Sequence, residues 1–197
     1  MNITSYSLKA GFQQRLLSAQ NLAVKYDISP NLITLISCGL CIVFAGLLYS
    51  NSAPTLFLIL LSPFLLLRMA LNALDGMVAT ATDSQSPVGS VLNEVCDVIS
   101  DVVLFAAITA LLPVPNNLWW GLIALAVLIE FLALAVYQAI GTRPFLGPFG
   151  KSDRAIYLGL LAVLLLLFPE SKTLFFAYVS AGVLLALITL WNRFKVV

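Results

Sequence analysis

Four side chains with oxygen donor atoms recur at helical spacing in two neighbouring apolar segments. Asn72 and Asp75 lie three residues apart in the first segment, and Asn93 and Asp97 lie four residues apart in the second. Each spacing puts both side chains of a pair on one face of a helix. Carboxylate and amide oxygens suit hard divalent cations such as Mg²⁺ or Mn²⁺. Two such faces, if they meet, predict a cation site shared by two helices.

Small residues lie next to the oxygen-bearing side chains in both predicted helices. Gly76, Ala79 and Thr80 follow Asp75, and Gly89 stands one turn before Asn93. A glycine removes the side chain where a second backbone or a ligand must come close. The glycines therefore indicate space beside the predicted oxygen ligands.

The same two segments carry three further charged residues, Arg68, Glu94 and Asp101. A charge at the centre of a membrane helix costs about 2.5–3.5 kcal/mol on insertion scales. These side chains should therefore face a polar cavity, a cation or one another. Glu130, in a later apolar segment, has no assigned role, and its predicted partner is either Arg68 or Arg143.

The composition indicates that lipid surrounds these segments. Hydrophobic residues make up 61% of the 197-residue chain and charged residues 10%, against roughly a quarter charged in soluble domains. A formal net charge of +1 gives no reason to expect nucleic acid as a partner. The chain has no histidine, so acid–base or metal chemistry must use carboxylates, amides and hydroxyls.

Apolar stretches about twenty residues long predict membrane-spanning helices. Six are expected, with turn formers between them: Asn31–Ser50, Leu56–Thr80, Val88–Leu112, Leu118–Ile140, Asp153–Phe168 and Leu174–Trp191. Ahead of them, Tyr6 to Tyr26 predicts an amphipathic helix at the membrane interface, with a plain cytoplasmic extension as the alternative. The predicted fold class is an all-α bundle of six transmembrane helices, with one membrane domain over residues 1–197: an interfacial helix at 1–28 and the bundle at 29–197.

The basic residues predict the orientation of this bundle. Most of them fall on one side of a six-span arrangement: Lys9, Arg15, Lys25, Arg143, Lys151, Arg154, Arg193 and Lys195. The positive-inside rule then places both termini in the cytoplasm. Asp75, Asp97 and the loop before Arg154 should all lie near the cytoplasmic side.

The full pattern resembles the signature of the CDP-alcohol phosphatidyltransferases, D-x-x-D-G-x-x-A-R, a short spacer, then G-x-x-x-D-x-x-x-D. Here Asn72-x-x-Asp75-Gly76-x-x-Ala79-Thr80 is followed, after eight residues, by Gly89-x-x-x-Asn93-x-x-x-Asp97. The Ser29–Thr34 stretch is similar to the opening of the family's first span, and Gly147–Ser152 is similar to its basic loop. The chain is thereby identified as a divergent bacterial member of the family.

The resemblance implies a reaction and roles for residues. Family members are six-span enzymes of phospholipid biosynthesis in which an alcohol displaces CMP from a CDP-linked lipid such as CDP-diacylglycerol. Three signature aspartates bind one or two divalent ions, Mg²⁺ or Mn²⁺, and the fourth is the proposed general base. Carried over, Asp97 is the base and a metal ligand beside Asp75, Asn72 and Asn93. The matched residues expected to bind substrate are Gly76, Ala79, Thr80 and Gly89.

Two basic residues after the fourth expected span, Lys151 and Arg154, are suited to hold a phosphate of the lipid or of the acceptor. The alternative, that they only anchor the cytoplasmic side, stays open. The resemblance also implies an inner-membrane location and a homodimer. It leaves the acceptor open among glycerol phosphate, inositol phosphate, serine and another phospholipid.

Three signature positions differ: asparagine stands at 72 and 93, and Thr80 replaces the arginine. Two lost anions should weaken metal binding, because a charge pair at about 4 Å is worth about 4 kcal/mol at an effective dielectric near 20. Glu94 and Asp101 are candidates to compensate, and Arg68 to replace the arginine. The substrate pyrophosphate is a further source of negative charge.

Three classes of function therefore compete. The first is an active transferase, which should release CMP from CDP-diacylglycerol and an alcohol. The second is a relative that binds CDP-lipid or metal without turnover. The third is a small transporter, which the absence of a visible internal repeat disfavours.

Overall fold

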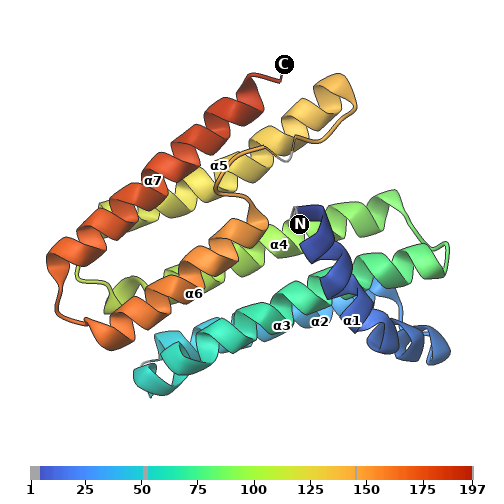
Figure 1. The fold of residues 1–197 in the computed structure, drawn as a ribbon, viewed down its shortest axis with the longest axis horizontal. Helices are drawn as coiled ribbons and strands as arrows, with labels where there is room; N and C mark the ends of the chain where they lie inside the picture. Colours follow the sequence, from blue (N-terminus) through green and yellow to red (C-terminus); the bar gives the residue numbers. More distant parts are fainter. Residues whose placement is uncertain (1–4, 51–52, 145, 197) are drawn as a thin grey trace. The chain divides into compact units, whose positions relative to one another are not determined.

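The computed structural model describes residues 5–50, 53–144 and 146–196, with side chains from Gly11 onward. All regular structure in these ranges is helical, which confirms the all-α class (Figure 1). The helices are α1 (Ser5–Lys25), α2 (Pro30–Tyr49), α3 (Pro54–Ala81), α4 (Pro87–Ala107), α5 (Asn116–Ile140), α6 (Lys151–Leu167) and α7 (Lys172–Phe194), with a short 3₁₀ helix, η1 (Thr109–Leu111). Ser52, one of the turn formers between the first two expected spans, lies outside the described residues, as does the side chain of Lys9, which contributes to the predicted orientation.

Local sequence explains where these helices begin and end. α2, α3 and α4 each begin with proline, whose fixed φ and missing N–H suit the first helical position. α6 begins where the Gly150 N–H donates to Asp153 Oδ2 at 2.9 Å. α5 ends at Gly141, whose left-handed φ of 72° lets its N–H reach the Tyr137 carbonyl.

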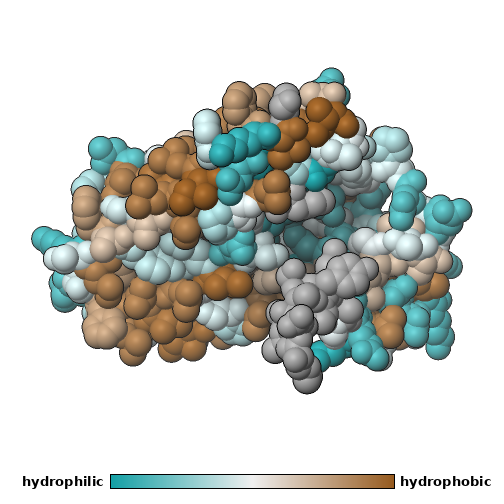
Figure 2. Space-filling model, turned by 45° about the horizontal axis from the view of Figure 1, so that its top comes forward, coloured by the Kyte–Doolittle hydropathy of each residue, from teal (hydrophilic) through white to brown (hydrophobic). Residues whose placement is uncertain are grey.

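Within the described ranges, the helices α2, α3, α5 and α7 are long and apolar enough to cross a membrane. α4 carries the acidic residues Glu94, Asp97 and Asp101, and α6 has only 17 residues. Large apolar side chains are exposed on all six helices from α2 to α7. Figure 2 shows such brown areas over much of the face in view. These features support a multi-pass membrane protein.

Tight local packing divides the chain into two compact units. The first unit comprises Met1–Cys41 and Leu66–Ile99, and the second comprises Ile42–Leu65 and Ser100–Val197. In the first unit, Ala23 of α1, Ile33 of α2 and Val78 of α3 form a buried apolar cluster. Gln20 Nε2 also donates to the Met77 carbonyl at 3.3 Å. α1 is thus a helix held against α3 by both apolar and polar contacts.

The core of the second unit is larger and richer in aromatic rings. α5 packs against α7, and these two helices run side by side in Figure 1. Trp119 is completely buried, stacks on Phe105 at 5.4 Å between ring centroids, and donates its indole N–H to the Phe105 carbonyl. α4 ends at Ala107, before the expected end of the third span at Leu112, because the chain tightens into η1.

Candidate functional site

The four oxygen-bearing residues of the predicted site come together within the first unit. Asn72 and Asp75 lie on α3, and Asn93 and Asp97 lie on α4. The two aspartates are buried, with exposed fractions of 3% for Asp75 and 6% for Asp97. The structure therefore brings together the two stripes that helical spacing predicted.

The Asp75 carboxylate accepts hydrogen bonds from three directions. The Thr34 hydroxyl of α2 donates to Oδ2 at 2.7 Å, and Asn93 Nδ2 donates to the same oxygen at 3.1 Å. The Gly76 N–H donates to Oδ1 at 2.6 Å. These three neutral donors hold the carboxylate in one orientation.

The Asp97 carboxylate is held by a second set of contacts. Asn72 Nδ2 donates to Oδ1 at 2.5 Å, while the Ser37 hydroxyl donates to Asn72 Oδ1 at 3.1 Å. Arg68 Nη2 lies 3.7 Å from Asp97 Oδ1 and donates to the Asp97 backbone carbonyl at 3.2 Å. Arg68, considered as a replacement for the signature arginine, is thus bound to Asp97 and only 6% exposed.

Each asparagine that departs from the signature therefore donates to a retained aspartate. A carboxylate at position 72 or 93 would lack the N–H donor and would place two negative charges in hydrogen-bond contact. The amide substitution makes this contact favourable without a cation. Carboxylate and amide form two matched pairs, Asn72–Asp97 and Asn93–Asp75.

A polar cavity of about 400 Å³ opens beside the Asp75 pair, lined by residues of α2, α3, α4 and the α3–α4 turn. Most of the side chains on its wall carry a hydroxyl, amide or carboxylate group. They include Thr34, Asp75, Thr80, Ser86, Asn93 and Glu94. Thr80 donates to the Gly76 carbonyl at 2.9 Å and accepts from Gln85 Nε2 at 3.0 Å.

The two glycines of the pattern have different surroundings. A Cβ added at Gly76 would meet no atom within 4 Å, so this glycine borders open space. A Cβ at Gly89 would lie 2.8 Å from Asn31 Oδ1, so Gly89 allows close approach of α4 to the start of α2. Gly76 and Gly89 both line the polar cavity, as does Ala79.

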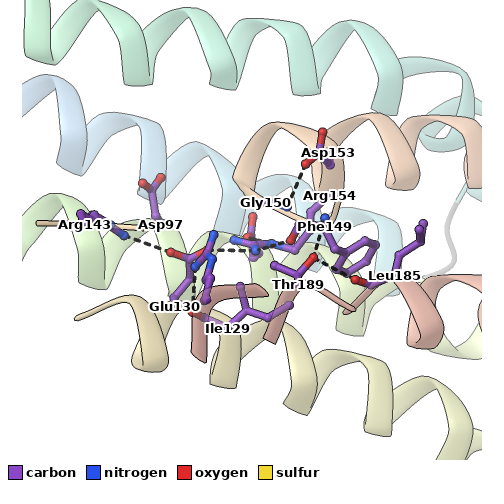
Figure 3. A network of polar contacts seen from close by, with 12 residues as sticks. Asp97, Ile129, Glu130, Arg143, Phe149, Gly150, Asp153, Arg154, Leu185 and Thr189 are labelled. Carbon is purple, nitrogen blue, oxygen red and sulfur yellow. Dashed lines mark hydrogen bonds and ion pairs between the residues drawn. The ribbon is translucent and has the colours of Figure 1, made fainter. Parts of the chain in front are cut away.

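The expected phosphate-binding residue Arg154 is buried in the second unit, with 1% exposure. Its Nε donates to Asp101 Oδ2 at 2.7 Å, and its Nη1 donates to Glu130 Oε1 at 3.0 Å and to the Phe149 carbonyl (Figure 3). Asp101, considered as a compensating metal ligand, is thus an ion-pair partner of Arg154. Lys151, the other expected phosphate ligand, is the first residue of α6 and is half-buried.

Glu130 is the centre of this network. Besides Arg154, it accepts from Arg143 Nη2 at 3.0 Å, and Arg193 Nη1 lies 3.7 Å from its Oε1. Of the two partners considered for Glu130, Arg143 is the one it contacts. We call Asp101, Glu130, Arg143, Arg154 and Arg193 the Glu130 cluster. Sequence reasoning missed the role of Arg193, although a cation in the last helix opposite an intramembrane acid was a usable signal.

The oxygen atoms of Asp75, Asp97 and Asn93 fit a hard divalent cation that takes only a few ligands from the protein. Among the described residues, no three carboxylate, thiolate or imidazole groups come together to hold a metal. Mg²⁺, however, commonly uses one or two carboxylates and completes its shell with water and substrate phosphate. Asp75 and Asp97 can supply those carboxylates, and the Asn93 amide can supply a carbonyl oxygen after rotation.

Comparison with known proteins agrees with this geometry. The family model described as CDP-alcohol phosphatidyltransferase matches residues 27–191. The inner membrane protein YnbA of Escherichia coli is 38% identical over 168 residues, which is 85% of this chain and 83% of that protein. A phosphatidylinositol phosphate synthase of Corynebacterium glutamicum is 35% identical over 99 residues, covering 50% of this chain and 39% of the synthase.

Two solved structures share the fold. Both are phosphatidylinositol phosphate synthase (PgsA1) of Mycobacterium tuberculosis, one with CDP-DAG bound and one in complex with manganese and citrate. They give TM-scores of 0.68 and 0.73 at 18% and 17% identity, and each covers 90% of this chain, with 89% and 86% of the synthase chain matched. Since the family model spans the two-part signature and most of the remaining sequence, this chain belongs to the CDP-alcohol phosphatidyltransferase family.

Proposed function

We propose that the protein transfers a phosphatidyl group from a CDP-linked lipid to an alcohol and releases CMP. The observation that carries this proposal is the meeting of Asp75 and Asp97 with Asn72 and Asn93 beside a polar cavity. The acceptor oxygen bonds to the phosphorus that carries the lipid, and the bond from that phosphorus to the bridging oxygen breaks. CMP leaves with the bridging oxygen, and the hydroxyl proton passes to a carboxylate.

The polar cavity is the proposed site of the nucleotide diphosphate. Its hydroxyl and amide groups offer donors to phosphate and ribose oxygens, and Gly76 leaves its wall open. Ala79, Thr80 and Gly89 belong to the same wall. The presence of CDP-DAG in a PgsA1 structure of the same fold supports this assignment.

A divalent metal, Mg²⁺ or Mn²⁺, is part of the proposal, and the manganese complex of PgsA1 supports it. When bound, such an ion neutralises charge on the pyrophosphate and on the departing CMP. Asp75 and Asp97 would hold it, with Asn72 and Asn93 as neutral ligands. Glu94, on the cavity wall, is a further candidate carboxylate, while Asp101 is bound to Arg154 in the second unit.

Asp97 is the proposed general base. It is buried, and Asn72 and Arg68 hold its carboxylate in place. A positioned base of this kind contributes about 10²–10⁴-fold to a rate. Lys151 stays a proposed phosphate ligand. The contacts of Arg154 with Asp101 and Glu130 favour the anchoring alternative for this residue.

We further propose that α4 and α6 are the remaining two spans of a six-span bundle. The Glu130 cluster would neutralise charges of α4 and α6 inside the second unit, which lowers the cost of inserting them. Residues 1–197 would form a single membrane domain with α1 at the interface, both termini cytoplasmic, and a homodimer as the assembly.

A second candidate function is a relative that binds CDP-lipid without turnover. It is favoured by the hydrogen bonds that Asn72 and Asn93 donate to the aspartates, since these satisfy the carboxylates without any ion. The two functions separate in one assay. Purified protein is incubated with CDP-diacylglycerol, Mg²⁺ or Mn²⁺ and a panel of alcohols. A transferase releases CMP, whereas retention of CDP-diacylglycerol without CMP would establish the binding function instead.

A further inference from the structure

A second cavity lies in the first unit, between α1 and α3, with a volume of about 950 Å³. Gln13, Gln14 and Gln20 line it from α1, and we call it the glutamine cavity. On α3 its wall includes Asn72, Gly76 and Thr80. Gly76 and Thr80 also line the polar cavity. The two cavities therefore have Gly76 and Thr80 of α3 in common as lining residues.

The two cavities are lined by different residues among Asn72, Asp75, Asn93 and Asp97. Asp75 and Asn93 line the polar cavity, whereas Asn72, the hydrogen-bond partner of Asp97, lines the glutamine cavity. A reaction with two substrates needs one place for the diphosphate and another for the attacking hydroxyl. Since Asn72 lines the glutamine cavity and donates to Asp97, a hydroxyl bound in this cavity lies near the Asn72–Asp97 pair.

The chemistry of the wall limits what can bind. None of the described residues that line the glutamine cavity is charged. A glutamine side chain offers one carbonyl acceptor and two N–H donors, which matches the mixed donors and acceptors of a hydroxyl group. A phosphate monoester carries close to two negative charges at neutral pH and needs cationic partners when it leaves water.

Arg154 does not offer that cationic partner. It is 1% exposed, and both Asp101 and Glu130 bind its guanidinium within the second unit. We propose that the glutamine cavity binds the acceptor and that the acceptor is an uncharged polyol. This inference rests on the proposed transferase function. The attacking hydroxyl of the polyol lies beside Asn72 and gives its proton to Asp97 as the oxygen–phosphorus bond forms and CMP departs.

Matched acceptors test the charge of the substrate directly. CMP release by the purified full chain is measured with CDP-diacylglycerol and Mg²⁺, using glycerol against glycerol 3-phosphate and inositol against inositol phosphate. We expect the uncharged member of a pair to react about ten-fold faster or more, because none of the described residues on the cavity wall is a cation that could pair with the phosphate. Faster reaction of the phosphorylated member would overturn the inference while leaving the transferase intact. CMP release with no acceptor at all would overturn both proposals.

A matched pair of variants on α1 tests the location. Gln13→Leu removes a cavity amide, and Asn21→Leu makes the same kind of change at an exposed α1 position outside the cavity lining. Gln13→Leu should raise KM for the polyol about three- to ten-fold and leave KM for CDP-diacylglycerol unchanged. Asn21→Leu should change neither. Equal effects of the two variants, or a rise in KM for CDP-diacylglycerol alone, would refute the glutamine cavity as the acceptor site.

Discussion

The two units surround their buried carboxylates with different sets of contacts. In the first unit, Asp75 and Asp97 accept hydrogen bonds from neutral amides and hydroxyls, and Arg68 lies 3.7 Å from Asp97. In the Glu130 cluster of the second unit, guanidinium groups bind the carboxylates directly at 2.7 to 3.0 Å. Neutral donors orient a carboxylate and keep its charge available, whereas close guanidinium groups compensate the charge.

This difference distinguishes the candidate site of the first unit from the ion-paired Glu130 cluster of the second. Asp75 of the first unit borders the polar cavity, where a bound cation can reach its carboxylate. The Glu130 cluster joins α4, α5, α6 and α7. Its two acids, Asp101 and Glu130, form ion pairs with arginines of the same cluster. Substitutions in the two sets should therefore separate activity from stability.

Replacing the proposed base should have the largest effect on activity. In Asp97→Asn we expect CMP release to fall by about 10²–10⁴-fold, because the amide cannot accept the hydroxyl proton. The variant should stay folded in detergent, since an amide at 97 can still hydrogen-bond with Asn72. Asp83→Asn, at an exposed turn residue, is the control and should keep full activity. Equal activity of the two variants would exclude Asp97 as the base.

Breaking the Glu130 cluster should have the largest effect on stability. Glu130→Gln leaves Arg143, Arg154 and Arg193 without their shared acid, and removing one partner of a buried ion pair costs about 3–5 kcal/mol. Thermal unfolding of the purified protein measures this loss. Glu170→Gln, at an exposed loop position, makes the same change without a buried pair. If both variants melt at the wild-type temperature, the cluster does not hold the second unit together.

Restoring the signature aspartates should make the first unit depend on metal. Asn72→Asp with Asn93→Asp removes two amide donors and sets carboxylates against Asp97 and Asp75. We expect Mn²⁺ to bind about 10–100-fold more tightly. The metal-free variant should melt earlier than wild type and regain stability as Mn²⁺ is added. Unchanged Mn²⁺ affinity would mean that positions 72 and 93 do not face the ion.

A smaller effect should follow from loosening Asn72. Ser37→Ala removes the hydroxyl that donates to Asn72 Oδ1, a contact worth about 0.5–1.5 kcal/mol. CMP release should fall about two- to ten-fold through poorer orientation of the Asn72–Asp97 pair. Ser18→Ala, at an exposed α1 position, should have no effect. A loss as large as that of Asp97→Asn would show that Ser37 does more than orient Asn72.

The sequence predicted which residues of the candidate site come together, but it did not predict which of their atoms form contacts. The spacing of Asn72, Asp75, Asn93 and Asp97 follows from helical periodicity, so two facing stripes could be predicted without coordinates. Which atom of each amide meets which carboxylate could not, because this depends on the Ser37 and Thr34 hydroxyls of α2, far along the chain.

For the fold, the sequence likewise predicted the helices but not all of their ends and contacts. Apolar length and turn residues predicted the helices from α2 to α7, and the alternation of apolar and basic residues from Tyr6 to Tyr26 predicted a helix where α1 lies. The early end of α4 at Ala107 depends on a local tightening with no clear signal in the sequence. The partners of Arg154 were also hidden. A basic residue after a glycine-rich loop indicates a phosphate ligand as readily as an ion-pair partner, and only packing in the second unit distinguishes the two.

Binding of Mn²⁺ to purified protein, followed by electron paramagnetic resonance with and without CDP-diacylglycerol, tests the central claim most directly. The wild type should bind the ion more tightly when CDP-diacylglycerol is present, because the pyrophosphate supplies charge that the two asparagines lack. Asp75→Asn should lose this binding while the protein stays folded. Equal Mn²⁺ binding by the wild type and Asp75→Asn would contradict a cation site built by α3 and α4.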